Sequence, residues 1–287
     1  MAFSVKLGMD SYSFHRLFGE LTKWEAPSDE QWTVTNFFNF LSTNQVQLAS
    51  LQTAYIDPRN PALEDEIREW ISVDPLREAI FTWGHPNGFD GGKKPEVLGN
   101  AIDFLHLSER LGITQMRIVL GNHWNFDTDS EERFRLLRPI VTEILELANK
   151  YKIRISIENH ADFPVRTLMK FIESFDDPRL GLCLDLGNSV RVGDDPVVLL
   201  QEFDIERIFM VQAKDVRKII GHEEPTGWWP TVLYGTGDVN LGKCIQVLKS
   251  KGFSDPIVVE ISNVFTGLNE KQVAIQALDF LRNELAG

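Results

Sequence analysis

Residues 152–160 read Lys-Ile-Arg-Ile-Ser-Ile-Glu-Asn-His, and this stretch indicates the fold. Its three isoleucines alternate with an arginine, a serine and Glu158, so apolar and polar side chains lie on opposite faces of an extended chain. A period of two is typical of a β-strand. Here the strand ends on the carboxylate of Glu158, and His160 follows two residues later. The sequence therefore predicts a strand that carries an acidic side chain at its C-terminal end.

The same pattern recurs three times further along the chain. Residues 180–188, 207–215 and 255–262 are apolar stretches that each bring an oxygen-bearing side chain to the same place. With the first stretch, the four side chains are Glu158, Asp185, Gln212 and Glu260, at intervals of 27, 27 and 48 residues. The equal intervals suit one strand, one loop and one helix per unit. The longer last interval indicates an extended loop after Gln212.

The rest of the chain alternates in the same way. Further strands are predicted at residues 5–10, 46–51, 79–83 and 114–120. Helices are predicted at residues 33–43, 60–73, 95–111, 130–150 with Ser130 as the cap, 164–174, 196–203, 240–251 and 269–285. Eight strands alternating with eight helices predict a parallel sheet closed into a (β/α)8 TIM barrel, an α/β fold. We expect one domain over residues 1–287, because no linker-like change of composition divides the chain.

Composition narrows the class of protein. The net charge is −13, which disfavours nucleic acid as a partner. Two cysteines do not make a disulfide framework and fit a reducing compartment. We see no signal peptide and no run long enough for a membrane span, so we expect a soluble cytoplasmic protein that does not bind membranes. Homo-oligomerisation stays open.

Strand parity points the four recurring side chains inward at the C-terminal mouth of the barrel, where active sites of this fold lie. Their carboxylates would repel one another unless a cation lay between them. Carboxylate and amide oxygens are hard ligands, which favour Mn²⁺, Mg²⁺ or Co²⁺. The alternative is that the four are charges solvated at strand ends. We expect one divalent metal ion, Mn²⁺ first, bound by Glu158, Asp185, Gln212 and Glu260.

A metal ion held in this way can bind a carbonyl oxygen and a neighbouring hydroxyl, and so stabilise an enediolate. Glu158 and Glu260 come from strands that are not adjacent, so they can flank a substrate. One can remove a proton and the other can return it. His160 shares the side of Glu158 and is a further acid/base or substrate-binding candidate, with a supporting or loop role as the alternative.

Several of these motifs resemble the xylose-isomerase-like TIM-barrel superfamily. They are Glu-Asn-His from Glu158, Leu-Asp-Leu-Gly-Asn around Asp185, Ala-Lys-Asp after Gln212, and Gly-Thr-Gly-Asp-Val-Asn-Leu before Val-Val-Glu260. The superfamily contains sugar (phosphate) isomerases and epimerases, inosose dehydratases and endonuclease-IV-like proteins. The resemblance implies that the four recurring residues bind one divalent metal ion. It also implies that the two glutamates handle protons, as in the ketose epimerases.

The chain departs from the common pattern of this superfamily at two positions. Many members have histidine where this chain has Gln212, although some dehydroshikimate-dehydratase-like members have glutamine there. Many also have a substrate-binding histidine where this chain has Asn188. Together the two departures weaken the resemblance to the epimerases, and they leave the predicted metal site in place.

Other residues near strand ends are candidates for substrate binding. Those expected to contact substrate are Lys214, Arg217, Asn188, His85 and, beside His123, Trp124. Lys214 and Arg217 could neutralise a carboxylate, phosphate or enolate oxygen, and the alternative for them is a solvated loop pair. For the histidines and Trp124 the alternative is packing. The loop that holds Trp228 and Trp229 could form a lid that stacks on a sugar or aromatic ring, with core packing or an oligomer contact as the alternative. The turn from Gly235 to Gly237 could hold a phosphate, although a plain turn is the simpler interpretation.

The sequence thus predicts a metal-dependent isomerase or epimerase that acts on a small keto-sugar or polyol. The main alternative is a dehydratase or lyase that forms the same enolate and then expels a β-leaving group from an inosose, a dehydroshikimate-like acid or a 3-keto-glycoside. A phosphodiesterase of damaged DNA is disfavoured by the acidity and by the small number of histidines. A catalytically inactive barrel that serves as a scaffold is the alternative from another class.

Overall fold

The computed structural model describes residues 5–22, 25–219, 229–265 and 267–287. In this part of the chain eight strands follow one another in chain order around a closed barrel, which confirms the predicted (β/α)8 fold. The strands are β1 (Leu7–Asp10), β2 (Leu48–Gln52), β3 (Glu78–Trp83), β4 (Gln115–Ile118), β5 (Arg154–Glu158), β6 (Leu180–Asp185), β7 (Ile208–Ala213) and β8 (Ile257–Val259). The α-helices are α1 (Val34–Thr43), α2 (Pro61–Val73), α3 (Leu98–Leu111), α4 (Ser130–Tyr151), α5 (Val165–Glu173), α6 (Leu186–Arg191), α7 (Pro196–Glu202), α8 (Leu241–Ser250) and α9 (Glu270–Ala286).

The predicted strands and helices are present, with boundaries moved by up to three residues, and local chemistry explains the boundaries. Helix α3 ends at Gly112, whose φ of 70° suits a residue without a Cβ. The prediction that Ser130 caps α4 is wrong by one residue. The carboxylate of Asp129 accepts a hydrogen bond from the backbone N–H of Glu131 at 2.9 Å, so Asp129 is the cap. The short helix α6, directly after Asp185, was not predicted.

The chain forms two compact units. Unit 1 comprises Met1–Ala49, Asp185–Glu206 and Val211–Gly287, and unit 2 comprises Ser50–Leu184 and Arg207–Met210. Within the described ranges, none of the helices combines the length and apolar character needed to cross a membrane.

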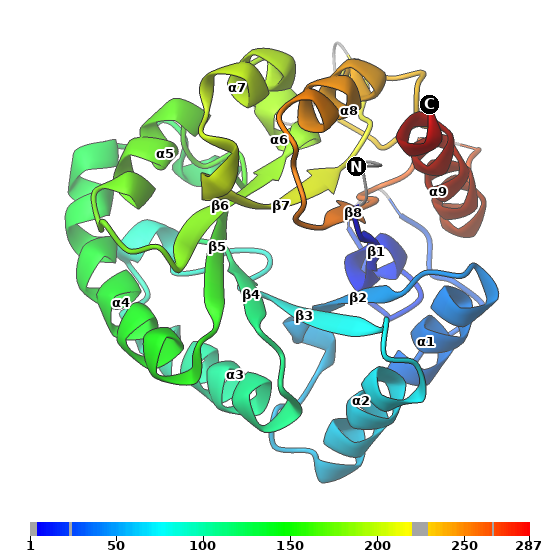
Figure 1. Cartoon of the computed structure of the whole chain (residues 1–287), viewed down its shortest axis with the longest axis horizontal. Helices are drawn as coiled ribbons and strands as arrows, with labels where there is room; N and C mark the ends of the chain where they lie inside the picture. Colours follow the sequence, from blue (N-terminus) through cyan, green and yellow to red (C-terminus); the bar gives the residue numbers. More distant parts are fainter. Residues whose placement is uncertain (1–4, 23–24, 220–228, 266) are drawn as a thin grey trace. The chain divides into compact units, whose positions relative to one another are not determined.

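In unit 2 the strands β3, β4, β5 and β6 pair in parallel. Arg117 lies opposite Ser156, and Glu158 lies opposite Cys183. Figure 1 shows α2, α3 and α4 following one another along the outer side of these strands. The ring of Phe104 on α3 packs edge-on against Phe81 of β3, with 5.4 Å between ring centroids. Helix α3 also contacts β4, and α4 contacts β5, so the helices pack against the strands whose ends carry polar side chains.

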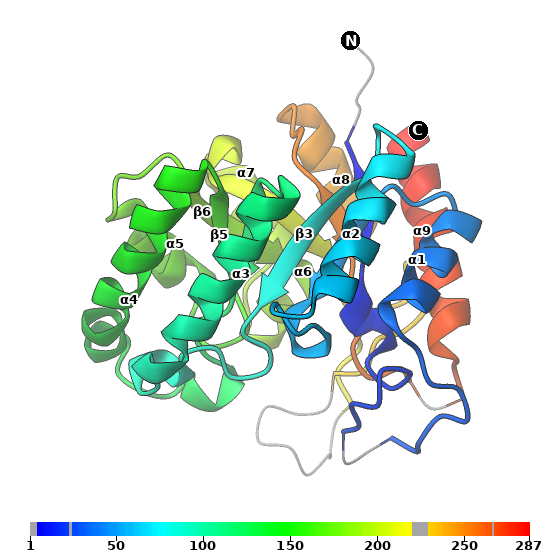
Figure 2. The ribbon, with the colours of Figure 1, turned by 90° about the horizontal axis from the view of Figure 1, so that it is seen from below.

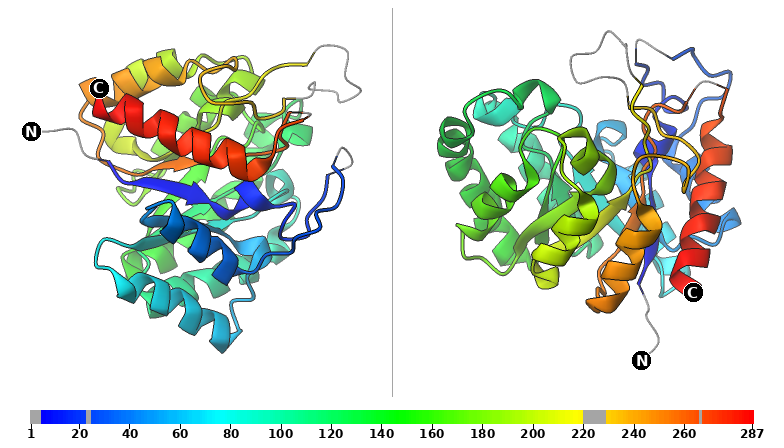
Figure 3. Two further views of the ribbon diagram at one scale, coloured as in Figure 1. Left: turned by 90° about the vertical axis from the view of Figure 1, so that its right-hand side faces the viewer. Right: turned by 90° about the horizontal axis from the view of Figure 1, so that it is seen from above.

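In unit 1 the C-terminal half of β7 pairs with β8, and β8 pairs with β1, all in parallel. Gln212 lies opposite Val258, and Met9 lies opposite Val259. Figure 2 shows α1 and α9 side by side, and Figure 3 shows α8 next to α9. A guanidinium N–H of Arg282 on α9 donates to the carbonyl oxygen of Asn44 at the end of α1. Helix α9 in turn packs against β8, the strand that Glu260 directly follows.

Candidate metal centre

Three of the four predicted metal ligands come together in unit 1, at the ends of β6, β7 and β8. The side chains of Asp185, Gln212 and Glu260 are buried. Gln212 Nε2 donates a hydrogen bond to Glu260 Oε2. Lys214 Nζ lies 2.8 Å from Asp185 Oδ2 and 2.6 Å from Glu260 Oε1. The two carboxylates and the amide therefore form one cluster, as the strand pattern predicted, and the lysine is part of it.

Asp185 has a second role that is local to its strand end. Its Oδ1 accepts a hydrogen bond from the backbone N–H of Asn188 at 2.7 Å, which caps α6. Asn188 is itself buried. Capping holds the Asp185 carboxylate in one orientation and directs Oδ2 toward Lys214. The predicted substrate-binding residue Asn188 is thus within the cluster through its backbone.

The electrostatics of this cluster suit a bound cation. Burial raises the pKa of Asp185 and the nearby Glu260 raises it further, while Lys214 lowers it. Two buried carboxylates and an amide oxygen are a ligand set that a hard divalent ion accepts. The residues of unit 1 therefore fit the predicted metal ion.

Glu158, the fourth predicted ligand, lies at the end of β5 in unit 2. Its side chain is buried, and Arg117 Nε lies 3.1 Å from Glu158 Oε2. Arg117 points from β4, whose register places it opposite Ser156, two residues before Glu158. The sequence analysis missed Arg117. The available signal was a charged residue in the centre of the apolar strand predicted at 114–120.

Two predicted histidines of unit 2 lie next to each other. The His85 and His160 rings have centroids 6.1 Å apart and cross at 83°. His160 Nδ1 lies 2.9 Å from the carbonyl oxygen of Gly121, which follows β4. Trp124 is 57% exposed, and its ring contacts that of His123 at 4.2 Å. Trp124 therefore has an exposed ring, whereas the two histidines pair at strand ends.

The segment after β1 adds side chains that were not chosen as site residues. Tyr12 is half-buried, and burial of its phenol raises its pKa, with Glu20 and Glu260 raising it further. The ring of His15 stacks on Tyr12 at 4.7 Å. His15 Nε2 lies 2.9 Å from Glu25, while its Nδ1 faces the carbonyl oxygen of Tyr12 at 2.9 Å. Since both ring nitrogens face acceptors, the surroundings favour the imidazolium form and raise the pKa of His15.

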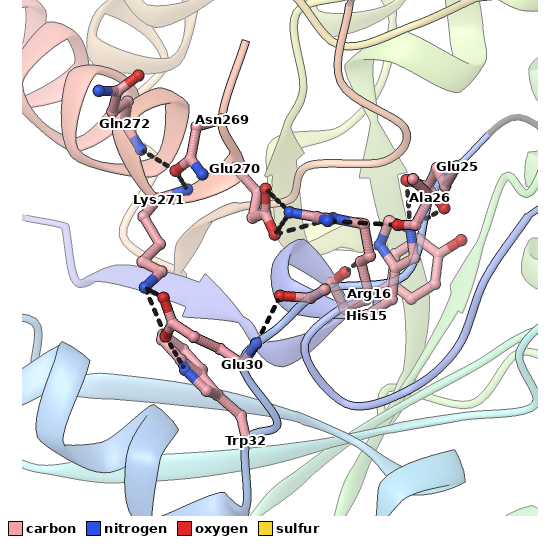
Figure 4. Close-up of polar contacts among 12 residues, drawn as sticks. His15, Arg16, Glu25, Ala26, Glu30, Trp32, Asn269, Glu270, Lys271 and Gln272 are labelled. Atoms are coloured by element: carbon pink, nitrogen blue, oxygen red, sulfur yellow. Dashed lines mark hydrogen bonds and ion pairs between the residues drawn. The ribbon is translucent and has the colours of Figure 1, made fainter.

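The same segment is tied to the start of α9, as Figure 4 shows. Arg16 pairs with Glu270 at 2.7 Å, and Lys271 pairs with Glu30 at 2.5 Å. Sequence separation of more than 240 residues hides both pairs from a reading of the chain. They fix the segment that carries Tyr12 within unit 1.

The turn at Gly235 binds a protein carboxylate, and the phosphate interpretation is not supported. Asp215 Oδ2 accepts hydrogen bonds from the backbone N–H groups of Gly235 at 2.8 Å and Gly237 at 3.0 Å. Asp215 Oδ1 accepts from Val239 N at 3.3 Å. These amides are already used, so the simpler interpretation of a structural turn is the better one. The exposed side chain of Arg217 donates to a backbone carbonyl beside this turn.

The proposed tryptophan lid is described only in part. Trp228 lies outside the described residues. Lys218 Nζ lies 5.5 Å from the ring centroid of Trp229, which is a cation–π contact.

Comparison with known proteins places the chain in a family. The model of the xylose isomerase-like TIM barrel family matches residues 4–284. The chain therefore belongs to the xylose isomerase-like TIM barrel family, as its motifs indicated.

Individual relatives are distant. The chain is 25% identical to the protein MJ1311 of Methanocaldococcus jannaschii over 247 residues, which cover 82% of this chain and 80% of that protein. It is 27% identical to the inosose isomerase of Halalkalibacterium halodurans over 134 residues, or 42% of this chain and 44% of that enzyme. That match spans less than half of the relative. Others are named L-ribulose-5-phosphate 3-epimerase, inosose dehydratase and 3-oxo-isoapionate decarboxylase. The relatives thus include isomerases, epimerases, dehydratases and decarboxylases.

Among solved structures, the IolI protein with a bound zinc atom has a TM-score of 0.71 at 15% identity. The match covers 98% of each chain. At this identity the likeness shows the shared barrel fold.

Proposed function

We propose that this protein is a divalent-metal-dependent isomerase or epimerase. It would move a proton next to the carbonyl group of a small keto-sugar or polyol, through an enediolate. The observation that carries the proposal is the buried cluster of Asp185, Gln212 and Glu260 in unit 1, at three of the predicted strand ends.

The proposed metal centre adds Glu158 of unit 2 to this cluster. Glu158, Asp185 and Glu260 are carboxylates that could together hold a metal ion. A family relative has been solved with zinc, which supports a divalent ion. The bound ion would polarise the substrate carbonyl group and so make the neighbouring carbon-bound proton more acidic. We propose Mn²⁺ as the preferred ion, with Mg²⁺ or Co²⁺ as substitutes, because the ligands are oxygen atoms.

In the proposed reaction the protein side chains bind the substrate and move the proton. Glu158 and Glu260 remove and return the carbon-bound proton, and the imidazole of His160 assists as an acid/base group. His85 lies beside His160 and would orient the same end of the substrate. The remaining substrate contacts would come from Lys214, Arg217, Asn188 and Trp124.

A second candidate is a dehydratase or lyase that uses the same enolate. Gln212 favours it, since the sequence has an amide where many epimerases of the family have an imidazole. The neutral amide donates to Glu260, and a donated hydrogen bond favours the ionised carboxylate that would serve as the base. The substrate would then carry a leaving group at the β-carbon, as in an inosose, a dehydroshikimate-like acid or a 3-keto-glycoside.

A metal-loaded activity screen separates these candidates. Keto-sugars, inososes and keto-glycosides would be incubated with the Mn²⁺-loaded protein in deuterated water. An epimerase conserves mass apart from one deuterium at the reacting carbon, whereas a dehydratase loses water and creates an ultraviolet-absorbing enone. Absence of deuterium uptake and of elimination with all three substrate classes would count against both candidates and favour an inactive barrel.

A further inference from the structure

The ammonium of Lys214 lies between the carboxylates of Asp185 and Glu260 in unit 1, and its stem packs beside Gly187. Its Nζ is 2.8 Å from Asp185 Oδ2 and 2.6 Å from Glu260 Oε1, and all three side chains are at most 6% exposed. A Cβ on Gly187 would come within 3.1–3.2 Å of the Cβ, Cγ and Cδ atoms of Lys214, so the lysine stem fills the space that this glycine leaves. Because buried carboxylates repel unless a cation lies between them, the ammonium neutralises this pair.

The other oxygen of each carboxylate is held by the protein. Asp185 Oδ1 accepts from the backbone N–H of Asn188 at 2.7 Å. Glu260 Oε2 accepts from Gln212 Nε2. Each carboxylate therefore has one fixed oxygen and one oxygen directed at the ammonium of Lys214. The two oxygens that contact Lys214 are also the natural ligand atoms for a metal ion at this place.

An ammonium and a divalent ion compete for these two oxygens. A divalent ion binds carboxylate oxygens at about 2.1 Å, and an ammonium donates to them at about 2.8 Å. Like charges that close repel strongly in a buried site. We propose that Lys214 and the divalent ion exchange at Asp185 Oδ2 and Glu260 Oε1. The ammonium holds the carboxylates together in the metal-free protein and leaves them when the ion binds. This inference rests on the metal centre proposed above.

Two measurable consequences follow for the variant Lys214→Met, which keeps the apolar stem and removes the charge. The metal-free variant should be less stable than wild type, because Asp185 and Glu260 lose their counter-charge. Its affinity for a divalent ion should be higher, because the ion no longer has to displace an ammonium. Removing a nearby positive charge raises the affinity even where that charge stays in place, so the reactivity of the Lys214 amine with and without Mn²⁺ is the measurement that reports whether the ammonium leaves.

The test is calorimetric titration of the full-length, metal-stripped protein with Mn²⁺ at one pH, together with melting temperatures before and after loading. Lys218→Met is the matched control, since it removes the same charge from the same loop at an exposed position. We expect Lys214→Met to bind Mn²⁺ at least tenfold more tightly than wild type, and Lys218→Met to stay within about twofold. Mn²⁺ should also raise the melting temperature of Lys214→Met more than that of wild type.

The outcomes separate this inference from the proposed function. Equal or weaker Mn²⁺ binding by Lys214→Met, with binding by wild type, overturns the exchange and leaves the metal centre intact. Binding of Mn²⁺ by Lys214→Met alone supports the competition, and it would mean that the ammonium of Lys214 excludes the ion from the wild-type protein. Binding by none of the three proteins overturns both the exchange and the metal centre.

A measurement on wild type covers the case in which Lys214→Met does not fold. Acetylation of lysine amines by a mild acylating reagent would be quantified by mass spectrometry with and without Mn²⁺. The exchange predicts that Mn²⁺ increases acetylation of Lys214 several-fold and leaves the exposed Lys243 unchanged. Protection of Lys214 that is the same in both states would contradict the exchange.

Discussion

The phenol of Tyr234 donates a hydrogen bond to the carbonyl oxygen of Ala213 at 2.5 Å and lies 3.2 Å from the carbonyl oxygen of Glu260. Tyr234 is fully buried, and burial raises its pKa. One side chain thus joins the end of β7 to the end of β8, next to two of the proposed metal ligands. Backbone geometry at Glu260 depends on a residue that lies 26 positions earlier in the sequence.

Replacing Tyr234 by phenylalanine should therefore loosen this junction. We expect the free energy of unfolding to fall by roughly 1–2 kcal/mol, since a buried carbonyl loses its donor. Thermal denaturation would measure the loss. Affinity for Mn²⁺ should fall as well, and an unchanged affinity would show that the hydroxyl supports the fold without positioning Glu260.

Glu158→Gln and Glu260→Gln should each abolish turnover while the protein stays folded. Loss of an essential acid or base typically costs about 10²- to 10⁴-fold in rate. Glu143→Gln, at an exposed position on α4, is the matched control and should keep wild-type activity. Near-wild-type turnover by either site variant would remove that glutamate from the mechanism.

Gln212 should bind the metal through Oε1, because its Nε2 already donates to Glu260. Gln212→Leu should then weaken Mn²⁺ binding, and Gln212→His should keep a metal site but shift its preference toward zinc. Elemental analysis and calorimetry of the three proteins would measure stoichiometry and affinity. Equal affinity in Gln212→Leu and wild type would assign Gln212 to substrate contact or packing.

Arg117→Met should destabilise the protein through Glu158. Removal of one partner from a buried ion pair leaves the other charge uncompensated, at a cost of about 3–5 kcal/mol. The double variant Arg117→Met, Glu158→Gln should recover part of this loss, because no buried charge remains. Chemical denaturation of both single variants and the double variant completes the cycle. Additive losses would mean that the pair at 3.1 Å is energetically independent.

The His15–Glu25 pair should make stability depend on pH in two directions. Burial opposes the charged form of His15, but Glu25 outweighs it and the pKa is raised above 6.5. Burial also opposes the charged form of Glu25, but His15 lowers the net pKa below 4.5. The imidazolium contribution is complete below pH 6.5 and is lost as the pH rises through the folded pKa of His15. The carboxylate contribution is complete above pH 4.5 and is lost as the pH falls through the folded pKa of Glu25.

The pair should thus stabilise the protein most between about pH 4.5 and 6.5. Glu25→Gln should cost roughly 2 kcal/mol in that interval and less at pH 9. Melting temperatures of wild type and variant across pH 4–9 measure the difference. A difference that does not change with pH would show that His15 does not titrate against Glu25.

The sequence predicted most of the fold because its signals are local. Period-two strands such as residues 152–158 and a repeated spacing of 27 residues are sufficient to define strand ends. The recurrence of Asp185, Gln212 and Glu260 at those ends also predicted their meeting in unit 1. Parity and spacing are the only information that this reasoning needs.

Other features depend on contacts between distant residues, which spacing does not encode. The sequence offered a carboxylate, a phosphate or an enolate oxygen as partners of Lys214, and only the structure shows that its Nζ contacts the carboxylates of Asp185 and Glu260. Asp215 was quoted for resemblance alone, although it organises the turn at Gly235. Arg117 needed the register of β4 against β5. Each of these residues has several possible partners of similar chemistry in the sequence. Only the distances in the folded chain show which partner it contacts.

The backbone N–H of Arg217 donates to the carbonyl oxygen of Pro230 at 3.1 Å, so these two residues lie side by side. Asp215 closes the base of that segment through the amides of Gly235 and Gly237. The two described ends of this stretch are therefore held by contacts outside residues 220–228. We therefore expect exchanges of sequence between Arg217 and Pro230 to leave the backbone at Gln212 and Glu260 undisturbed. Arg217 and Pro230 are thus suitable junctions for exchanging this stretch with those of other members of the family.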